Sequence, residues 1–64
     1  MIGTRLRKLR TDKDMTQEEM ADLLSVTPQA ISRWENGKVE PSLATVVEIA
    51  KFFHINTDEL LEVR

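Results

Sequence analysis

The chain has 64 residues, the length of one small domain, and its 41% hydrophobic content is ordinary for a globular protein. It contains no Cys and no long apolar run, which excludes a disulfide framework, a thiolate metal site and a membrane span, so we expect a soluble, cytoplasmic protein. The net charge of −2 argues by itself against nucleic-acid binding, but this charge is unevenly distributed.

Residues 2–11 are expected to form a helix, because their apolar residues recur at i, i+4 and i+7. This stretch is basic: residues 1–13 have a charge balance of +4, against −4 for residues 14–35. The cations that could meet phosphate are Arg5, Arg7 and Lys8. Ordinary solvated helix charge is the favoured interpretation for any one of them.

A second helix is expected over residues 17–24. Thr16 is a suitable N-cap, and Glu19 three places later completes a capping box. Gln17 lies at the helix N-terminus, where free backbone N–H groups and the helix dipole favour a bound phosphate. The alternative is that Gln17 contacts no phosphate and is merely tolerated as the first residue of the helix.

A third helix is expected over residues 28–36. Thr27 is its N-cap, Pro28 occupies the first helical position, and Gly37 is suited to end it. The turn before this helix has about three residues, so the two helices must cross steeply. The pattern predicts a helix-turn-helix over residues 16–36.

One face of the third helix carries no aliphatic side chain and no carboxylate. Its members recur at i, i+3, i+4 and i+7 and are Gln29, Ser32, Arg33 and Asn36. These groups match base edges in the major groove, where Arg pairs with guanine and Gln or Asn with adenine. An ordinary solvated face is the alternative, although such faces usually mix Glu and Lys. Trp34 is in phase with Ile31, which predicts a place in the core.

Ser42 is expected to begin a fourth helix over residues 43–53, which is apolar around much of its circumference and therefore buried or in contact with another subunit. Asn56, with Glu59 three places later, is expected to begin a fifth helix. The apolar end of that helix would dock on the first helix or pair with a second copy. His54 between them fits a helix C-cap better than a metal site.

This pattern resembles the Cro/CI-type (XRE-like) helix-turn-helix of phage repressors and small bacterial regulators. The residues that carry the resemblance are Gln17, Glu19, Ala21, Val26, Thr27, Ile31, Trp34, Glu35, Asn36, Gly37 and Pro41. It covers residues 5–61 and implies an all-α fold, a compact five-helix lambda-repressor-like DNA-binding domain, with residues 1–64 as a single domain. Ser25 departs from the family, which usually has Gly at this turn, and a left-handed conformation there costs Ser more.

The resemblance implies a sequence-specific regulator of transcription that binds double-stranded DNA, with repression by operator occupancy as a homodimer on an inverted repeat. The base-reading residues would be Pro28, Gln29, Ser32 and Arg33. The phosphate contacts would be Gln17, Thr27, Asn36 and Lys38. The resemblance also implies a partly buried structural ion pair between Arg10 and Glu35.

The chain shows no catalytic constellation, so we expect no enzyme, no cofactor and no metal. Two further interpretations stay open. In one, the chain is an antitoxin-like interaction module that binds a partner protein and represses its own promoter, without a membrane. In the other, it is the DNA-binding part of a longer regulator.

Overall fold

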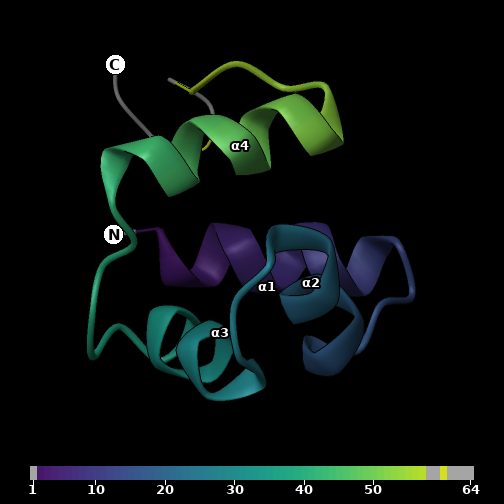
Figure 1. The fold of residues 1–64 in the computed structure, drawn as a ribbon. Helices are drawn as coiled ribbons and strands as arrows, with labels where there is room; N and C mark the ends of the chain where they lie inside the picture. Colours follow the sequence, from purple (N-terminus) through teal and green to yellow (C-terminus); the bar gives the residue numbers. More distant parts are fainter. Residues whose placement is uncertain (1, 58–59, 61–64) are drawn as a thin grey trace.

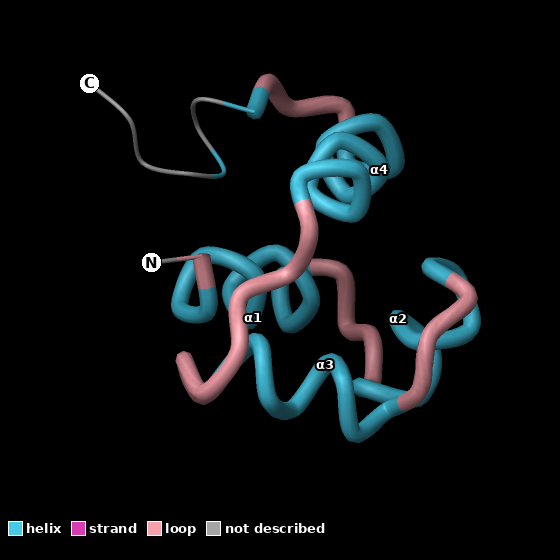
Figure 2. The backbone as a smooth tube through the Cα atoms, turned by 60° about the vertical axis from the view of Figure 1, so that its left-hand side comes forward, coloured by secondary structure: helices cyan, strands magenta, loops and turns pink. Residues whose placement is uncertain are grey.

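Four α-helices make up the part of the chain that the computed structural model describes, which is residues 2–57 and 60. They are α1 (Gly3–Asp12), α2 (Gln17–Leu24), α3 (Pro28–Glu35) and α4 (Leu43–Phe53). Figure 1 shows α4 at the top of the molecule and α3 at the bottom, and the turned view in Figure 2 keeps this order. The helices α3 and α4 therefore lie on opposite sides. Within the described residues, none of the helices has the length and hydropathy that a bilayer crossing requires.

Hydroxyl side chains begin three of these helices, as the sequence predicts. The Thr16 side chain accepts a hydrogen bond from the Glu19 backbone N–H at 3.0 Å, and Glu19 Oε1 accepts one from the Thr16 N–H at 2.8 Å. Thr27 and Ser42 each accept from the backbone N–H three residues later, in both cases at 3.2 Å. The capping box and the starts of α2, α3 and α4 are confirmed.

Residues other than glycine end two of the helices in the left-handed conformation. Ser25 ends α2 with φ of 59°, and His54 ends α4 with φ of 56°. The cap role expected of His54 is confirmed. A side chain with a Cβ costs about 1 kcal/mol or more in this conformation, so both helix ends carry local strain. After α3, the left-handed position with φ of 74° is Gly37, which adopts it freely.

One apolar core takes side chains from every helix. Its buried members are Ile2, Leu6, Met20, Ala21, Leu24, Ile31, Trp34, Val46, Ile49 and Leu60. Trp34 is only 8% exposed, which confirms its predicted place in the core. Because the core uses one side of α3, the other side of that helix is left for the surface.

The start of α1 lies directly on the end of α3. A Cβ atom at the buried Gly3 would stand 2.5 Å from the carbonyl oxygen of Trp34 and 2.7 Å from that of Glu35. These are backbone atoms that cannot rotate away, so the close approach requires glycine. The two helices are thereby held in direct contact near the C-terminal end of α3.

The prediction of a five-helix domain was wrong, because the described residues form four helices. The expected fifth helix falls partly on residues 58, 59 and 61, which lie outside the described residues. Its sequence signal was a cap and a staple over a single turn, and so short a segment gains little stability from helix formation alone. In the described part, Leu60 is fully buried and its N–H donates to the Asn56 carbonyl at 3.3 Å.

Candidate nucleic-acid interface

The polar face of α3 is directed away from the core. The residues expected to read bases lie along it, with Gln29 and Arg33 exposed and Pro28 and Ser32 half-buried. The residues expected to contact phosphates are the exposed Thr27, Asn36 and Lys38 and the half-buried Gln17. The predicted residues thus come from α3, its two ends and the start of α2. Their arrangement is that of a short helix presented with flanking polar groups.

The turn between α2 and α3 is short because of two local features. The Val26 N–H donates to the Ala21 carbonyl at 2.9 Å, which folds the chain back directly after α2. Ala21 itself is fully buried, and its small side chain lets the two helices approach closely. A turn this short is expected to make α2 and α3 cross steeply.

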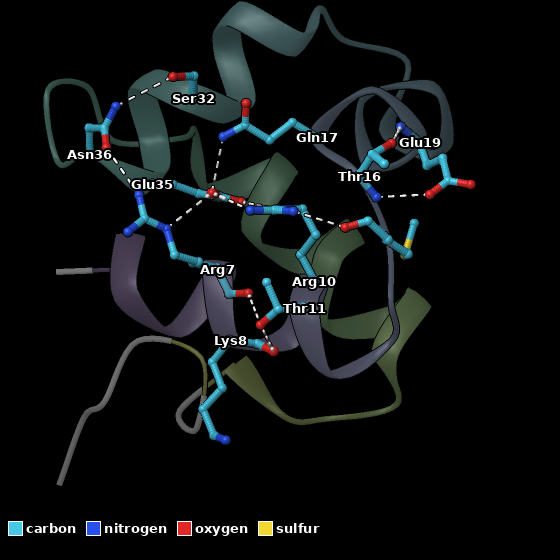
Figure 3. Close-up of polar contacts among 11 residues, drawn as sticks. Arg7, Lys8, Arg10, Thr11, Thr16, Gln17, Glu19, Ser32, Glu35 and Asn36 are labelled. Carbon is cyan, nitrogen blue, oxygen red and sulfur yellow. Dashed lines mark hydrogen bonds and ion pairs between the residues drawn. The ribbon is translucent and has the colours of Figure 1, made fainter.

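The centre of the site is the carboxylate of Glu35, whose side chain has no exposed surface. Arg10 donates to it twice, from Nε to Oε2 at 2.7 Å and from Nη2 to Oε1 at 3.1 Å. Arg10 Nη1 also donates to the Met15 carbonyl at 2.8 Å, which ties the α1–α2 loop to the same pair. Figure 3 shows Arg10 beside the Glu35 carboxylate. A bidentate geometry of this kind gives a fixed orientation as well as attraction.

Two further donors reach the Oε1 atom of Glu35. Arg7 Nε lies 3.4 Å from Glu35 Oε1, and Gln17 Nε2 donates to Oε1 at 3.2 Å. The residues that surround Glu35 therefore come from α1, α2 and α3, and we call this group the Glu35 cluster: Arg7, Arg10, Gln17 and Glu35. No buried side-chain nitrogen or oxygen of the described residues lacks a hydrogen-bond partner. A buried charge is tolerated under such conditions.

The ionisation of Glu35 is determined by two opposing effects. Burial, the larger single effect, raises the pKa of the carboxyl group, because a charge is poorly solvated there. The hydrogen bonds from Arg10, Gln17 and Arg7 and the positive charge of Arg10 together outweigh burial, so the pKa of Glu35 is lowered. The hydrogen bond to Glu35 correspondingly raises the pKa of Arg10. The pair is therefore charged at neutral pH.

Arg7 connects the Glu35 cluster to the exposed end of α3, which the sequence did not indicate. Its Nη2 donates to Asn36 Oδ1 at 3.1 Å, while Asn36 Nδ2 lies 3.4 Å from Ser32 Oγ. The result is a chain of polar contacts from the buried carboxylate to the α3 surface (Figure 3). Arg7 and Asn36 are 29 positions apart, so no local spacing pattern could have revealed their contact.

The basic charge of α1 is largely used within the molecule. Arg7 and Arg10 face Glu35, and Lys8 Nζ lies 3.3 Å from Asp12 Oδ2 in an exposed pair. An exposed pair of this type contributes little stability, but it reduces the charge that Lys8 offers to a phosphate. In residues 2–57 and 60 no three His, Cys, Asp or Glu side chains are grouped so that they could hold a metal ion.

The sequence matches the family model described as helix-turn-helix over residues 6–60. That match covers most of the chain. It includes the whole Glu35 cluster and the polar face of α3. The chain therefore belongs to the helix-turn-helix family, as the resemblance of its motif predicted.

The similar curated proteins are regulators of transcription. Over 60 residues the chain is 47% identical to the HTH-type transcriptional activator BcrR of Enterococcus faecalis, covering 94% of the chain and 29% of the relative. It is 42% identical over 62 residues to the SPbeta prophage-derived HTH-type transcriptional regulator YonR of Bacillus subtilis, covering 97% of the chain and 57% of the relative. The chain thus spans between about a third and just over half of these two proteins.

The fold also matches a solved structure, that of the P22 c2 repressor protein in complex with a synthetic operator. The TM-score is 0.85, the sequence identity is 27%, and the match covers 94% of this chain and 91% of the other. At this coverage the similarity extends over the whole arrangement of helices rather than the helix-turn-helix alone.

Proposed function

We propose that this chain is a sequence-specific, double-stranded-DNA-binding regulator of transcription that acts by occupying an operator and catalyses no reaction. The observation that carries the proposal is the exposed polar face of α3 in a fold that matches a repressor bound to its operator. An α-helix fits the major groove, where amide and guanidinium groups can distinguish base pairs.

In this proposal α3 enters the major groove with its first turn foremost. Gln29 and Arg33, both exposed, contact base edges directly, with Arg33 pairing to guanine and Gln29 to adenine. Pro28 and Ser32 are half-buried and contribute shorter contacts at the same edge. The register is set by phosphates that meet Gln17, Thr27, Asn36 and Lys38.

We further propose that two copies bind together on an inverted repeat, with half-sites about 10 base pairs apart. Several large apolar side chains remain exposed on the single chain and could be covered by a second copy. They are Leu23, Val39, Leu43 and Phe52. Leu43, at 71% exposure, is the most solvent-accessible of these.

The sign of regulation in this proposal is repression, because a protein that occupies an operator can block transcription without any further domain. The relatives include both activators and repressors. BcrR is named an activator, and the similar RstR of Vibrio cholerae is named a cryptic phage transcriptional repressor. The two signs share the same DNA-binding step.

The test is selection from a randomised pool of duplex DNA, followed by sequencing of the retained molecules. An enriched inverted repeat is the expected result, and its half-site spacing measures the dimer geometry. One unrepeated half-site would contradict the dimer alone. The absence of any enriched sequence at low salt would overturn DNA reading and favour a protein partner.

A further inference from the structure

Arg7 has a position in this molecule that neither solvated charge nor a simple ion pair explains. Its guanidinium contacts two different acceptors, Glu35 Oε1 at 3.4 Å and Asn36 Oδ1 at 3.1 Å. The Arg7 side chain is 52% exposed, whereas the Glu35 side chain is fully buried. Arg7 therefore lies at the boundary between the buried Glu35 carboxylate and the surface of α3.

The contact with Arg7 fixes which way the Asn36 amide points. A guanidinium has only donors, so the oxygen of the amide must face Arg7 and the nitrogen must face away. Asn36 Nδ2 accordingly faces Ser32 Oγ at 3.4 Å. That nitrogen carries two hydrogens and Ser32 engages one of them, so the second is available to donate to an oxygen outside the protein.

Glu35 orients a second amide by the opposite rule. A carboxylate only accepts, so the nitrogen of Gln17 must face Glu35, as the 3.2 Å contact shows. In Figure 3, Gln17 and Asn36 lie on either side of Glu35 and Arg7. The paired Arg7 and Glu35 thus fix the orientation of two amides, that of Gln17 at the start of α2 and that of Asn36 directly after α3.

We propose that Arg7 is a positioning residue of the DNA-binding surface, which presets the Asn36 amide to donate to a backbone phosphate. This inference rests on the proposed function. An exposed amide that is free to rotate loses side-chain entropy on binding, and an amide already held in the binding orientation loses less. Arg7 thereby strengthens binding through Asn36, without itself touching DNA.

The rival role for Arg7 is a direct phosphate contact, and a double-mutant cycle separates the two. Affinity for the selected operator would be measured for wild type, Arg7→Ala, Asn36→Ala and the double variant. If Arg7 acts through Asn36, each single variant loses affinity, by about tenfold for Asn36→Ala, and the double variant binds about as well as Asn36→Ala. Independent, multiplying losses would overturn the proposal.

A charge-preserving variant sharpens the result. Arg7→Lys keeps the positive charge, but a single ammonium lacks the planar fork that reaches two acceptors at once. We expect it to bind more weakly than wild type, with an unchanged dependence of affinity on salt concentration. Binding of Arg7→Lys equal to wild type would show that charge alone matters and would overturn the proposal.

Lys8→Ala is the matched control, since it removes one charge from the same helix at a residue whose ion pair, among the described residues, is with Asp12. It should show no energetic coupling to Asn36→Ala, and coupling as large as that of Arg7 would also count against the proposal. All variants would be compared at a temperature where circular dichroism shows each to be folded. If wild-type protein itself selects no DNA sequence, the proposed function fails; if it does and the cycle is additive, only the role of Arg7 fails.

Discussion

The two sides of this molecule are held together by different kinds of interaction. On one side, α1 and α3 meet around the buried, charged Glu35 cluster. On the other side, α4 packs through the buried apolar residues Val46, Ile49 and Ala50. Hydrogen bonds to a carboxylate are directional, whereas apolar burial is not. The comparison indicates that directional contacts fix how α1 and α3 meet on the charged side, whereas apolar packing holds α4 on the other.

The largest effect is expected on the charged side. Glu35→Ala would leave Arg10, whose side chain is only 14% exposed, without its carboxylate. Removing one member of a buried pair costs about 3–5 kcal/mol, which approaches the whole stability of a domain of this size. Urea unfolding followed by circular dichroism measures the loss.

The matched control is Glu48→Ala, which removes the same side chain from an exposed position on α4. It should change stability by no more than about 0.5 kcal/mol. A Glu35 variant as stable as this control would show that the Glu35 cluster is not structurally important.

A somewhat smaller effect is expected on the apolar side. Ile49→Ala removes a fully buried side chain from α4 and leaves a cavity, at a cost of about 3 kcal/mol. Leu43→Ala on the same helix removes an apolar side chain that is 71% exposed, so it should cost far less. Equal losses at the two positions in urea unfolding would mean that α4 packs differently from this structure.

The dependence of stability on pH separates the two sides more sharply. Because the pKa of Glu35 is lowered in the folded state, its contribution is fully present above the unfolded value of about 4.3 and is lost as pH falls through the folded pKa. Wild type and Ile49→Ala should therefore lose stability on acidification with similar slopes. In Glu35→Gln the unfolding free energy should depend less steeply on pH. A pH dependence equal to that of wild type would show that Glu35 does not cause the loss of stability in acid.

On the proposed DNA-binding face, substitutions should affect binding rather than stability. Arg33 is exposed, so Arg33→Ala should leave the unfolding free energy nearly unchanged while costing about 1–3 kcal/mol at the operator and relaxing preference at one base pair. Lys38→Ala is the comparison: it should weaken all sequences alike and reduce the salt slope by about 1. If Arg33→Ala binds the operator as tightly as wild type, Arg33 is not a base-reading residue.

The smallest expected effect is a gain in stability at the end of α2. Ser25 holds φ of 59°, which glycine adopts without strain, so Ser25→Gly should stabilise the domain by about 0.5–1 kcal/mol. Ser25→Ala keeps a Cβ and should give no gain. Thermal unfolding of the two variants makes the comparison, and equal stabilities would mean that the turn is unstrained.

The parts of this structure that could be predicted from sequence are those with local causes. Three helices begin with a hydroxyl that accepts a hydrogen bond from the backbone N–H three residues later, and such short spacings are visible in the sequence. These N-caps are Thr16, Thr27 and Ser42. The ion pair of Arg10 and Glu35 was expected only from the resemblance to a family, because these residues are 25 positions apart.

Other features had no local signal at all. The contacts of Gln17 and Arg7 with Glu35 join positions 18 and 28 residues apart, so spacing rules do not reveal them. The close approach at Gly3 likewise depends on how α1 meets α3. The expected fifth helix is not among the four helices of the described residues, and part of its span lies outside them.

The Glu35 cluster also has a consequence for the order in which the chain folds. The contacts between α2 and α3 are local, whereas Arg7 reaches Glu35 across 28 residues and must close a long loop first. We therefore expect α1 to dock after the α2–α3 pair has formed. Weakening the cluster would then speed unfolding more than it slows folding, which stopped-flow kinetics would show as a larger change in the unfolding limb than in the folding limb.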